Sequence, residues 1–176
     1  MVNNMVVKKI CSGKLCLRHF RKSDAKAYLE AHDEEAKKNF SSYPRTLKQA
    51  EKEVADLMKD YPVSIEKRDR ESFVVEYDGK FAGNITVHHI NFKESGEATS
   101  GSMISPEFRG KRIGSRAHKL LIPYVFKTYG LKRVVGRCIN SNKASIKNLL
   151  RSGYKRDYRH FLNEEGKKVF VIRTLK

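Results

Sequence analysis

A basic loop containing glycines, which joins an extended run to an amphipathic run, most constrains how this chain can fold. The loop spans residues 104–115 and reads ISPEFRGKRIGS. The apolar residues that follow recur at helical spacing on one face: Ile113, Ala117, Leu120, Leu121, Tyr124 and Val125. The stretch therefore predicts a strand, a tight basic loop and the start of a helix.

The composition of this loop is that of an anion site. Glycine lets the backbone turn tightly and approach a ligand closely, and free N–H groups at a helix N-terminus bind anions. The loop carries positive charge on Arg109, Lys111, Arg112 and Arg116. We interpret it as a pyrophosphate-binding loop, although its spacing matches neither the Walker pattern nor the dinucleotide fingerprint. A strand-turn-helix junction that binds nothing is the alternative.

The remaining patterns predict a single domain of alternating strands and helices. Strands are expected at residues 14–20, 72–77, 81–90, 97–104, 131–139, 154–162 and 169–175. Helices are expected at residues 24–32, 47–60, 114–129 and 145–152, with polar loops or turns at 37–45, 61–70, 91–96 and 163–166. We expect Ser23 to cap the first helix, Thr46 and Gln49 to form a capping box, and Pro123 to kink or break the third helix.

Length and composition limit the class of protein. A chain of 176 residues suits one domain with a real core, and it has no apolar run near the roughly 20 residues of a membrane helix. The first nine residues lack the apolar region of a signal peptide, so we expect a cytoplasmic protein. The three cysteines, Cys11, Cys16 and Cys138, match no zinc spacing. They are expected to be reduced core thiols, and no metal site is predicted.

The net charge of +17 indicates which partners the chain attracts. Such a field draws polyanions, so it favours RNA or a ribosomal surface, or it reflects only a basic proteome. The same field argues against a polycationic substrate such as a polyamine.

A second motif opens the helix expected at residues 145–152. Asn142 and Ser145 are plausible N-terminal caps, and Gly153 is a helix stop. The spacing Asn-x-x-Ser, followed eight residues later by Gly153 and Tyr154, is explained in part by these local roles alone.

Together the two motifs resemble those of the GNAT N-acetyltransferases. The loop resembles motif A, Gln/Arg-x-x-Gly/Ala-x-Gly/Ala, and the second run resembles motif B, Asn-x-x-Ser followed by Gly-Phe/Tyr. Residues 17–25 are similar to the opening of the RimJ/RimL branch, which acetylates ribosomal proteins. The resemblance covers about residues 15–175. It implies a GNAT fold over the single domain 1–176, an α/β (α+β) arrangement with a mixed central sheet of about six to seven strands flanked by about four helices.

The resemblance also implies an enzyme that uses acetyl-CoA as cosubstrate and transfers the acetyl group directly to a primary amine. A protein N-terminal α-amine, such as that of a ribosomal protein, is the expected acceptor. The implied cofactor-binding residues are Met103, Ile104, Arg109, Gly110, Lys111, Arg112, Ile113, Gly114, Ser115 and Asn142. Among them, Met103 and Ile104 would orient the pantetheine arm, and Arg112 departs from the pattern by standing where the family usually has a glycine.

The implied catalytic residues are Ser145 and Glu97. Many GNAT enzymes have a tyrosine general acid at the position of Leu149, so Ser145 is the expected proton donor to the departing thiolate. Glu97 is the carboxylate nearest to the position where family members often have a glutamate, and it is the expected general base. His88 and His89 are alternatives to Glu97, although a histidine on a strand is more often structural.

Other assignments stay open at this stage. The side chains of Tyr43, Arg45 and His160 could line the acceptor groove or could be ordinary surface residues. The alternative functions are a non-catalytic RNA- or ribosome-binding module on the same fold, and an acetyltransferase for a small-molecule amine. The chain is expected to be a monomer or a homodimer without a membrane partner.

Overall fold

The computed structural model describes residues 9–39, 42–90, 96–162 and 168–175, and it describes side chains as far as residue 156. The expected turn at 163–166, almost all of the turn at 91–96 and the side chain of His160 lie outside this description.

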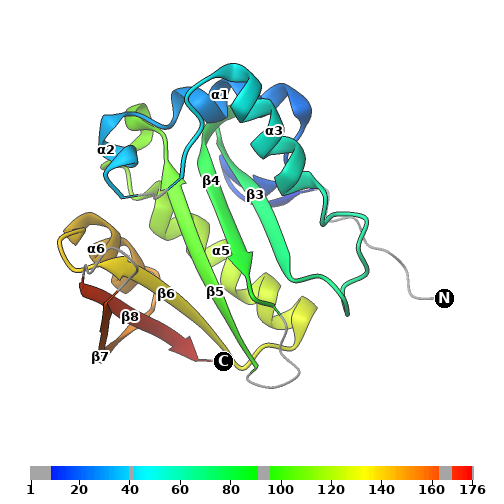
Figure 1. Cartoon of the computed structure of the whole chain (residues 1–176). Coiled ribbons are helices and arrows are strands. Elements are labelled where there is room, and N and C mark those ends of the chain that lie inside the picture. Colours follow the sequence, from blue (N-terminus) through cyan, green and yellow to red (C-terminus); the bar gives the residue numbers. More distant parts are fainter. Residues whose placement is uncertain (1–8, 40–41, 91–95, 163–167, 176) are drawn as a thin grey trace.

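The described strands form one mixed sheet of eight strands in the order β1-β2-β3-β4-β5-β6-β8-β7 (Figure 1). Their bounds are β1 Ile10–Ser12, β2 Leu15–Arg18, β3 Arg70–Tyr77, β4 Lys80–His88, β5 Glu97–Ile104, β6 Arg133–Ile139, β7 Lys155–Leu162 and β8 Lys168–Leu175. Neighbouring strands run antiparallel, except that β5 and β6 are parallel. The expected fold class is confirmed. The additional strand is β1, whose three residues are too few to show an alternating pattern.

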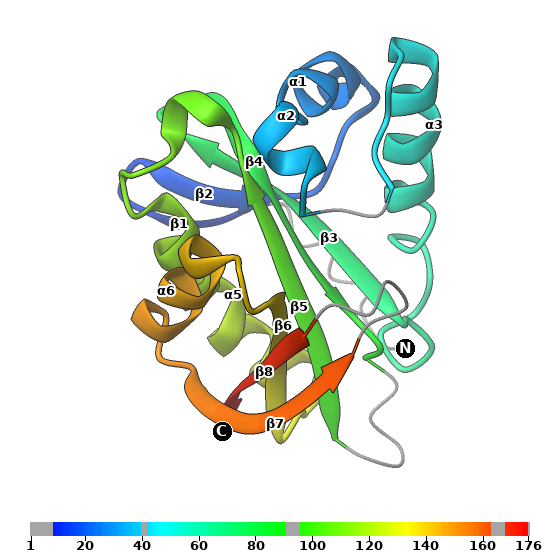
Figure 2. The same cartoon turned by 60° about the vertical axis from the view of Figure 1, so that its left-hand side comes forward.

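Helices cover both faces of this sheet. The helical segments are η1 Lys22–Asp24, α1 Ala25–Glu30, α2 Glu34–Lys37, α3 Leu47–Met58, η2 Pro106–Phe108, α5 Ile113–Tyr129 and α6 Lys143–Arg151. Helix α5 lies on one face, and α1 and α3 lie on the other (Figures 1 and 2). The larger core packs between α5 and the sheet, and a smaller core packs beneath α1 and α3. The strand β3 therefore has a covered face on either side, with Phe73 and Val75 in the larger core and Val74 in the smaller one.

Helix α5 continues through Pro123, so the expected break, one of the two predicted outcomes, is wrong. Proline removes one hydrogen bond from a helix interior and crowds the preceding turn. Here Pro123 faces solvent, while Leu121, Val125 and Tyr129 remain buried against the sheet. Packing of the apolar face holds the helix together, and the solvent side absorbs the local distortion.

The start of the first helix also differs from expectation. Ser23 lies inside the short helix η1 and does not cap it. The Asp24 carboxylate accepts a hydrogen bond from the backbone N–H of Arg21 at 2.7 Å and pairs with both terminal nitrogens of Arg18. Helix α2, which falls partly in the predicted polar loop, is capped by Asp33.

The capping box at α3 is confirmed with one shift. The Thr46 hydroxyl accepts from the Gln49 N–H at 3.3 Å, while the Gln49 side chain accepts from the N–H of Arg45 at 2.7 Å.

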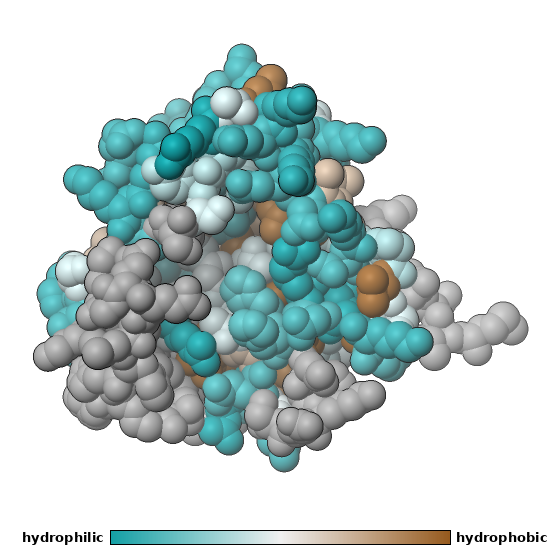
Figure 3. Space-filling view, in the orientation of Figure 1, coloured by the Kyte–Doolittle hydropathy of each residue, from teal (hydrophilic) through white to brown (hydrophobic). Residues whose placement is uncertain are grey.

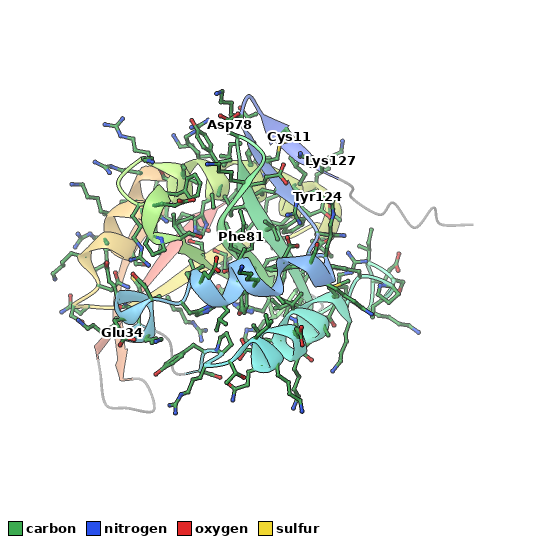
Figure 4. All side chains as sticks on the ribbon, turned by 90° about the horizontal axis from the view of Figure 1, so that it is seen from above. Cys11, Glu34, Asp78, Phe81, Tyr124 and Lys127 are labelled. Atoms are coloured by element: carbon green, nitrogen blue, oxygen red, sulfur yellow. A yellow bond between two sulfur atoms is a disulfide. The ribbon has the colours of Figure 1, made fainter. Side chains whose placement is uncertain are left out.

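Two of the three cysteines differ from the expected reduced core thiols. Cys11 and Cys16 face each other in the β1–β2 hairpin and form a disulfide, with their Cα atoms 4.1 Å apart. Cys11 lies close to the turn that carries Asp78 in Figure 4, and the N–H of Asp78 donates to the Lys14 carbonyl at 2.9 Å. Cys138 is a free, buried thiol, as expected.

Hydrophilic residues dominate the face shown in Figure 3, and hydrophobic residues appear there only as small separate patches. Nitrogen-tipped side chains extend from most of the outline in Figure 4, in keeping with the net charge of +17. Among the described residues, no helix is both long and apolar enough to cross a membrane.

Candidate active site

The two parallel strands separate at the centre of the sheet. Pairing between β5 and β6 extends from Glu97 and Arg133 to Ser100 and Gly136, and the described pairs end there. On their outer sides β5 stays paired with β4 as far as Ile104, and β6 stays paired with β8 to Ile139. The strands diverge toward α2 and α6 (Figure 1). Backbone donors and acceptors on the facing edges are therefore available to a ligand in the gap.

The N-terminus of α5 lies at the open end of this gap. The first helical N–H groups have no acceptor within the helix, and the cap residue Arg112 supplies no side-chain hydrogen bond. Gly110 and Arg112 both have left-handed backbone conformations, with φ of 76° and 59°. Only glycine adopts this region without steric cost, so Arg112 is strained where the related motif has glycine. The result is an uncapped helix end, which attracts anions.

One pocket of about 730 Å³ joins the gap to this helix end. Its size is that of a small-molecule or cofactor site. Its cationic lining residues are Arg109, Arg112, Arg137, Lys147 and Arg151. Glu35 is the acidic residue among the described lining, and its carboxylate pairs with Arg109 at 2.9 Å. The pocket therefore has a positive potential that favours a phosphorylated ligand.

Helix α6 forms the wall opposite β5 and is held close by two glycines. A Cβ at Gly136 would lie 2.7 Å from a Leu149 methyl group, and a Cβ at Gly114 would lie 2.8 Å from the Asn148 amide oxygen. The α6 N-terminus is capped by Asn142, which accepts from the Ser145 N–H at 2.9 Å. The close approach therefore places Asn142 and Ser145 along the pocket.

A thiol also faces this wall. Burial raises the pKa of Cys138 above its ordinary value, and a hydrogen bond with Ser145 offsets only part of that rise. Cys138 is thus a protonated thiol at neutral pH and not a nucleophile.

The structure brings most of the sequence-predicted site residues together. The pocket lining includes Met103, Ile104, Arg109, Gly110, Arg112, Ile113, Gly114, Ser115, Asn142 and Ser145. Lys111 does not line it and instead lies over the Phe108 ring, 5.5 Å from the centroid. The Arg109 side chain binds Asp33 through two 2.8 Å hydrogen bonds and holds the pKa of that carboxyl at about 2. Arg109 therefore fastens α2 to the loop, and its side chain is already engaged.

Glu97 lies outside the pocket lining. It begins β5, three residues before Ser100. Its carboxylate lies 3.7 Å from Arg133 and is not part of the pocket lining. His88 pairs with Thr99, next to Ser100, but neither His88 nor His89 is part of the pocket lining. A general base must come within hydrogen-bond reach of its proton, directly or through one water, and none of these three side chains lines the pocket.

A buried histidine on α5 was missed by the sequence interpretation. His118 is 1% exposed and lines the pocket. Its Nε2 lies 3.1 Å from the Ser102 hydroxyl and its Nδ1 3.2 Å from the Tyr154 hydroxyl, which in turn lies 2.7 Å from that of Ser100. Burial lowers the pKa of His118 to about 4, so the imidazole is neutral at pH 7. Its position beside Ala117, within the apolar face of the helix, was the available signal.

Among the described residues, no group of three or more His, Cys, Asp or Glu side chains could hold a metal ion. The residues that line the site can orient a ligand, bind an anion and transfer protons through hydroxyl and imidazole groups.

Known proteins share this architecture. The acetyltransferase (GNAT) domain family matches residues 14–155. The spermidine N(1)-acetyltransferase of Escherichia coli (strain K12) is 35% identical over 82 residues, which make up 47% of this chain and 42% of that protein. The chain thus matches less than half the length of that relative.

Solved structures agree over nearly the whole chain. RimL, the ribosomal L7/L12 α-N-protein acetyltransferase, solved with coenzyme A, superposes with a TM-score of 0.84 at 16% identity and covers 95% of this chain and 97% of its own. RimJ of Mycobacterium smegmatis, in complex with CoA-disulfide, superposes with a TM-score of 0.79 at 16% identity and covers 92% and 81%. At these identities the likeness establishes the fold.

Proposed function

The chain belongs to the acetyltransferase (GNAT) domain family, and on this premise we propose that it transfers the acetyl group of acetyl-CoA directly to a primary amine. The acceptor that we propose is the α-amine of a protein N-terminus. The observation that carries the proposal is the continuous pocket that joins the gap between β5 and β6 to the uncapped N-terminus of α5.

The pocket fits the two chemically distinct parts of the cosubstrate. The pyrophosphate is an anion that would bind the N–H groups of Ile113, Gly114 and Ser115, assisted by the positive charge of Arg112. The pantetheine arm carries amides that would hydrogen-bond to the facing edges of β5 and β6, as an added strand would. On the other wall, Asn142 is placed to contact the same arm.

Acetyl transfer would follow from orientation in this gap. The acceptor amine attacks the thioester carbonyl, and the backbone N–H of Ile104, on the edge of β5 that faces away from β4, would hold and polarise the arm beside it. The family resemblance assigns Ser145 as the hydroxyl that protonates the departing thiolate. Its half-buried position on the pocket wall is compatible with this role.

An α-amine acceptor follows from the cost of deprotonation. An amine must be neutral to attack, and this costs about 1.4 kcal/mol at pH 7 for an α-amine but about 4.6 kcal/mol for a lysine side chain. Glu35, the carboxylate in the described lining, is ion-paired with Arg109 and is a poor candidate to offset the larger cost. The RimJ and RimL neighbours and the net charge of +17 support an acceptor on or near the ribosome.

A small-molecule amine is the second candidate, because the matching relative is a spermidine acetyltransferase. The net charge of +17 opposes it, since a polyamine is a polycation.

The first test is binding. Acetyl-CoA at about 100 times its dissociation constant should stabilise the fold by about 2.7 kcal/mol, measured as a thermal shift. The absence of any shift at millimolar acetyl-CoA would leave the non-catalytic RNA- or ribosome-binding module as the better description.

The second test is the acceptor, read by mass spectrometry on a matched peptide pair. One peptide has a free N-terminus and blocked lysines, and the other has a blocked N-terminus and free lysines. Faster acetylation of the first is expected, whereas faster acetylation of the second contradicts the α-amine assignment. Spermidine in parallel, if it reacts faster than both peptides, establishes the small-molecule alternative.

A further inference from the structure

Four polar groups form one continuous chain of hydrogen bonds that starts and ends on β5. The order is Ser102, His118, Tyr154 and Ser100, with successive contacts of 3.1, 3.2 and 2.7 Å. His118 and Tyr154 are 1% and 3% exposed, while the two serines line the pocket or border it. This series of hydrogen bonds therefore passes through the protein interior and has both of its ends at the gap between β5 and β6.

This series of hydrogen bonds contains one more proton than it has bonds. Each hydroxyl carries one proton and a neutral imidazole carries one, so the four groups hold four protons for three hydrogen bonds. Tyr154 is buried, so its proton is used within these bonds, and in either direction one terminal serine then accepts a bond and keeps its own proton for a partner in the pocket. The other terminal serine donates inward and keeps a free lone pair. The chain thus presents a proton donor at one end and a proton acceptor at the other.

Its location matches the point where the reaction would occur. Ser100 is the last residue of β5 that pairs with β6, so both serines lie at the narrow end of the gap. They are two residues apart on one face of an extended strand, with Cα atoms about 7 Å apart. The reacting group would have to fit between the two serine hydroxyls. It consists of the amine nitrogen and the sulfur on one tetrahedral carbon, with a hydrogen bond of about 3 Å at each end, and its length is similar to this separation.

We propose that Ser102, His118, Tyr154 and Ser100 form a proton relay that carries the proton lost by the attacking amine to the departing sulfur. This inference rests on the proposed function and supplies a proton acceptor within the pocket lining, which Glu97 does not. The C–N bond forms and the C–S bond breaks. One terminal serine takes the ammonium proton while the other gives its own proton to the sulfur.

The internal steps balance without charging the histidine. Each group passes one proton onward, so the imidazole loses a proton from one ring nitrogen as it gains one on the other. The three hydrogen bonds end reversed, and rotation of the hydroxyls with exchange to pocket water restores them. No carboxylate and no oxidant or reductant takes part. A neutral His118, which burial imposes through its pKa of about 4, is the form that this relay needs.

The test uses the full chain, acetyl-CoA and the accepted peptide in single-turnover experiments. Tyr154→Phe removes one hydroxyl and keeps the ring, and His118→Asn removes the imidazole. Each should lower the transfer rate by about 10²-fold, with little change in the KM for acetyl-CoA. In the wild type, the rate in mixtures of H₂O and D₂O should depend on the D₂O fraction along a curve, since several protons move together. In Tyr154→Phe that dependence should become smaller and linear.

Ser102 offers a matched pair that tests the hydroxyl itself. Ser102→Val and Ser102→Thr have the same shape and both suit a strand, but only threonine keeps the hydroxyl. The threonine variant should recover a large part of the rate lost in the valine variant. Tyr124→Phe is the control, because Tyr124 lies on α5 like His118 but outside the pocket lining. This variant should keep the curved dependence of the rate on the D₂O fraction.

Three outcomes overturn the relay while leaving acetyl transfer intact: full rates in Tyr154→Phe and His118→Asn, an unchanged dependence on D₂O in those variants, or equal rates in Ser102→Val and Ser102→Thr. Loss of rate in Ser145→Ala alone would make Ser145 the sole donor. Absence of CoA release by the wild type with any amine would instead contradict the proposed function. Thermal stabilisation of each variant by acetyl-CoA confirms that it is folded.

Discussion

The two halves of α5 contact two buried polar networks that differ in kind. In the C-terminal half, Tyr124 and Tyr129 donate to Glu71, which is fully buried, at 2.9 and 2.6 Å. His19 and Arg68 bind the other carboxylate oxygen at 2.8 and 2.9 Å. In the N-terminal half, His118 makes one contact through each ring nitrogen, and its network reaches the pocket.

The difference separates a structural network from a functional one. Burial raises the pKa of Glu71, but the hydrogen bonds from His19 and the tyrosines and the charge of Arg68 outweigh it and lower the pKa overall. Every acceptor position of that carboxylate is used, so the cluster has no capacity for a ligand. The His118 network is neutral and keeps one proton for a partner outside. The Glu71 carboxylate, with all its acceptor positions used, holds the helix in place. The neutral His118 network, with one proton unused, can exchange protons with a ligand.

The largest effect should come from Glu71→Gln. The change keeps the shape but leaves the Arg68 guanidinium buried without its counterion, which costs about 3–5 kcal/mol of stability. Denaturant unfolding measures this loss. The matched control is Asp60→Asn, which breaks a more exposed ion pair with Arg70 and should cost less than about 1 kcal/mol. Equal losses in the two variants would mean that the Glu71 network is not an anchor.

The next effect is the pH dependence that His118 gives to stability. Its pKa is about 4 in the folded chain and about 6.5 when unfolded, so unfolding takes up a proton between these values. The contribution is fully present above pH 6.5, and on the order of 3 kcal/mol is lost as the pH falls to 4. The lowered pKa of Glu71 acts in a separate window, below its ordinary value of 4.5.

Unfolding curves recorded from pH 7.5 to 4.5 test this difference. The loss of stability should be smaller in His118→Asn than in the wild type. His32 and His88 also have pKa values lowered by burial, so the difference between the two proteins isolates His118. Parallel pH profiles would show that His118 is solvated or charged in the folded protein.

The smallest effects concern the backbone at the two ends of α5. Arg112 before the helix and Gly130 after it both lie in the left-handed region, with φ of 59° and 64°. Because only glycine tolerates this region freely, Arg112→Gly should stabilise the free protein by about 1 kcal/mol and Gly130→Ala should destabilise it by a similar amount. A Cβ at Gly130 would meet no atom within 4 Å, so the second effect is purely conformational.

Acetyl-CoA binding gives a second test of the N-terminal end of α5. Arg112→Gly should weaken acetyl-CoA binding modestly and reduce its salt dependence, because a cation is lost beside the anion site. Titration calorimetry at two salt concentrations measures both. Tighter binding in Arg112→Gly would show that the arginine obstructs the ligand.

Features set by neighbouring residues could be predicted from the sequence. The bounds of β5 and the capping roles of Thr46 and Asn142 depend on residues within a few positions of each other. The anion loop was located for the same reason, and its predicted cofactor-binding residues line one pocket, except Lys111.

Features that join distant segments could not be predicted. The Glu71 network combines residues from β3, α5 and the segments after β2 and α3, and no local pattern records that meeting. Local spacing made Glu97 the closest carboxylate to the motif, whereas in the folded chain its carboxylate lies beside Arg133 and outside the pocket lining. The Cys11–Cys16 pairing needed the hairpin register, which a three-residue strand does not reveal.

The contact between Gly136 and Leu149 makes these two positions interdependent in any redesign of the enzyme. Since the Leu149 methyl groups occupy the space that a side chain at position 136 would need, a larger group at either site pushes α6 away from β6. The same helix carries Ser145 and is capped by Asn142, so such a change also widens the ligand gap. A tyrosine at position 149 would thus displace the wall, which agrees with the serine that we propose as the acid.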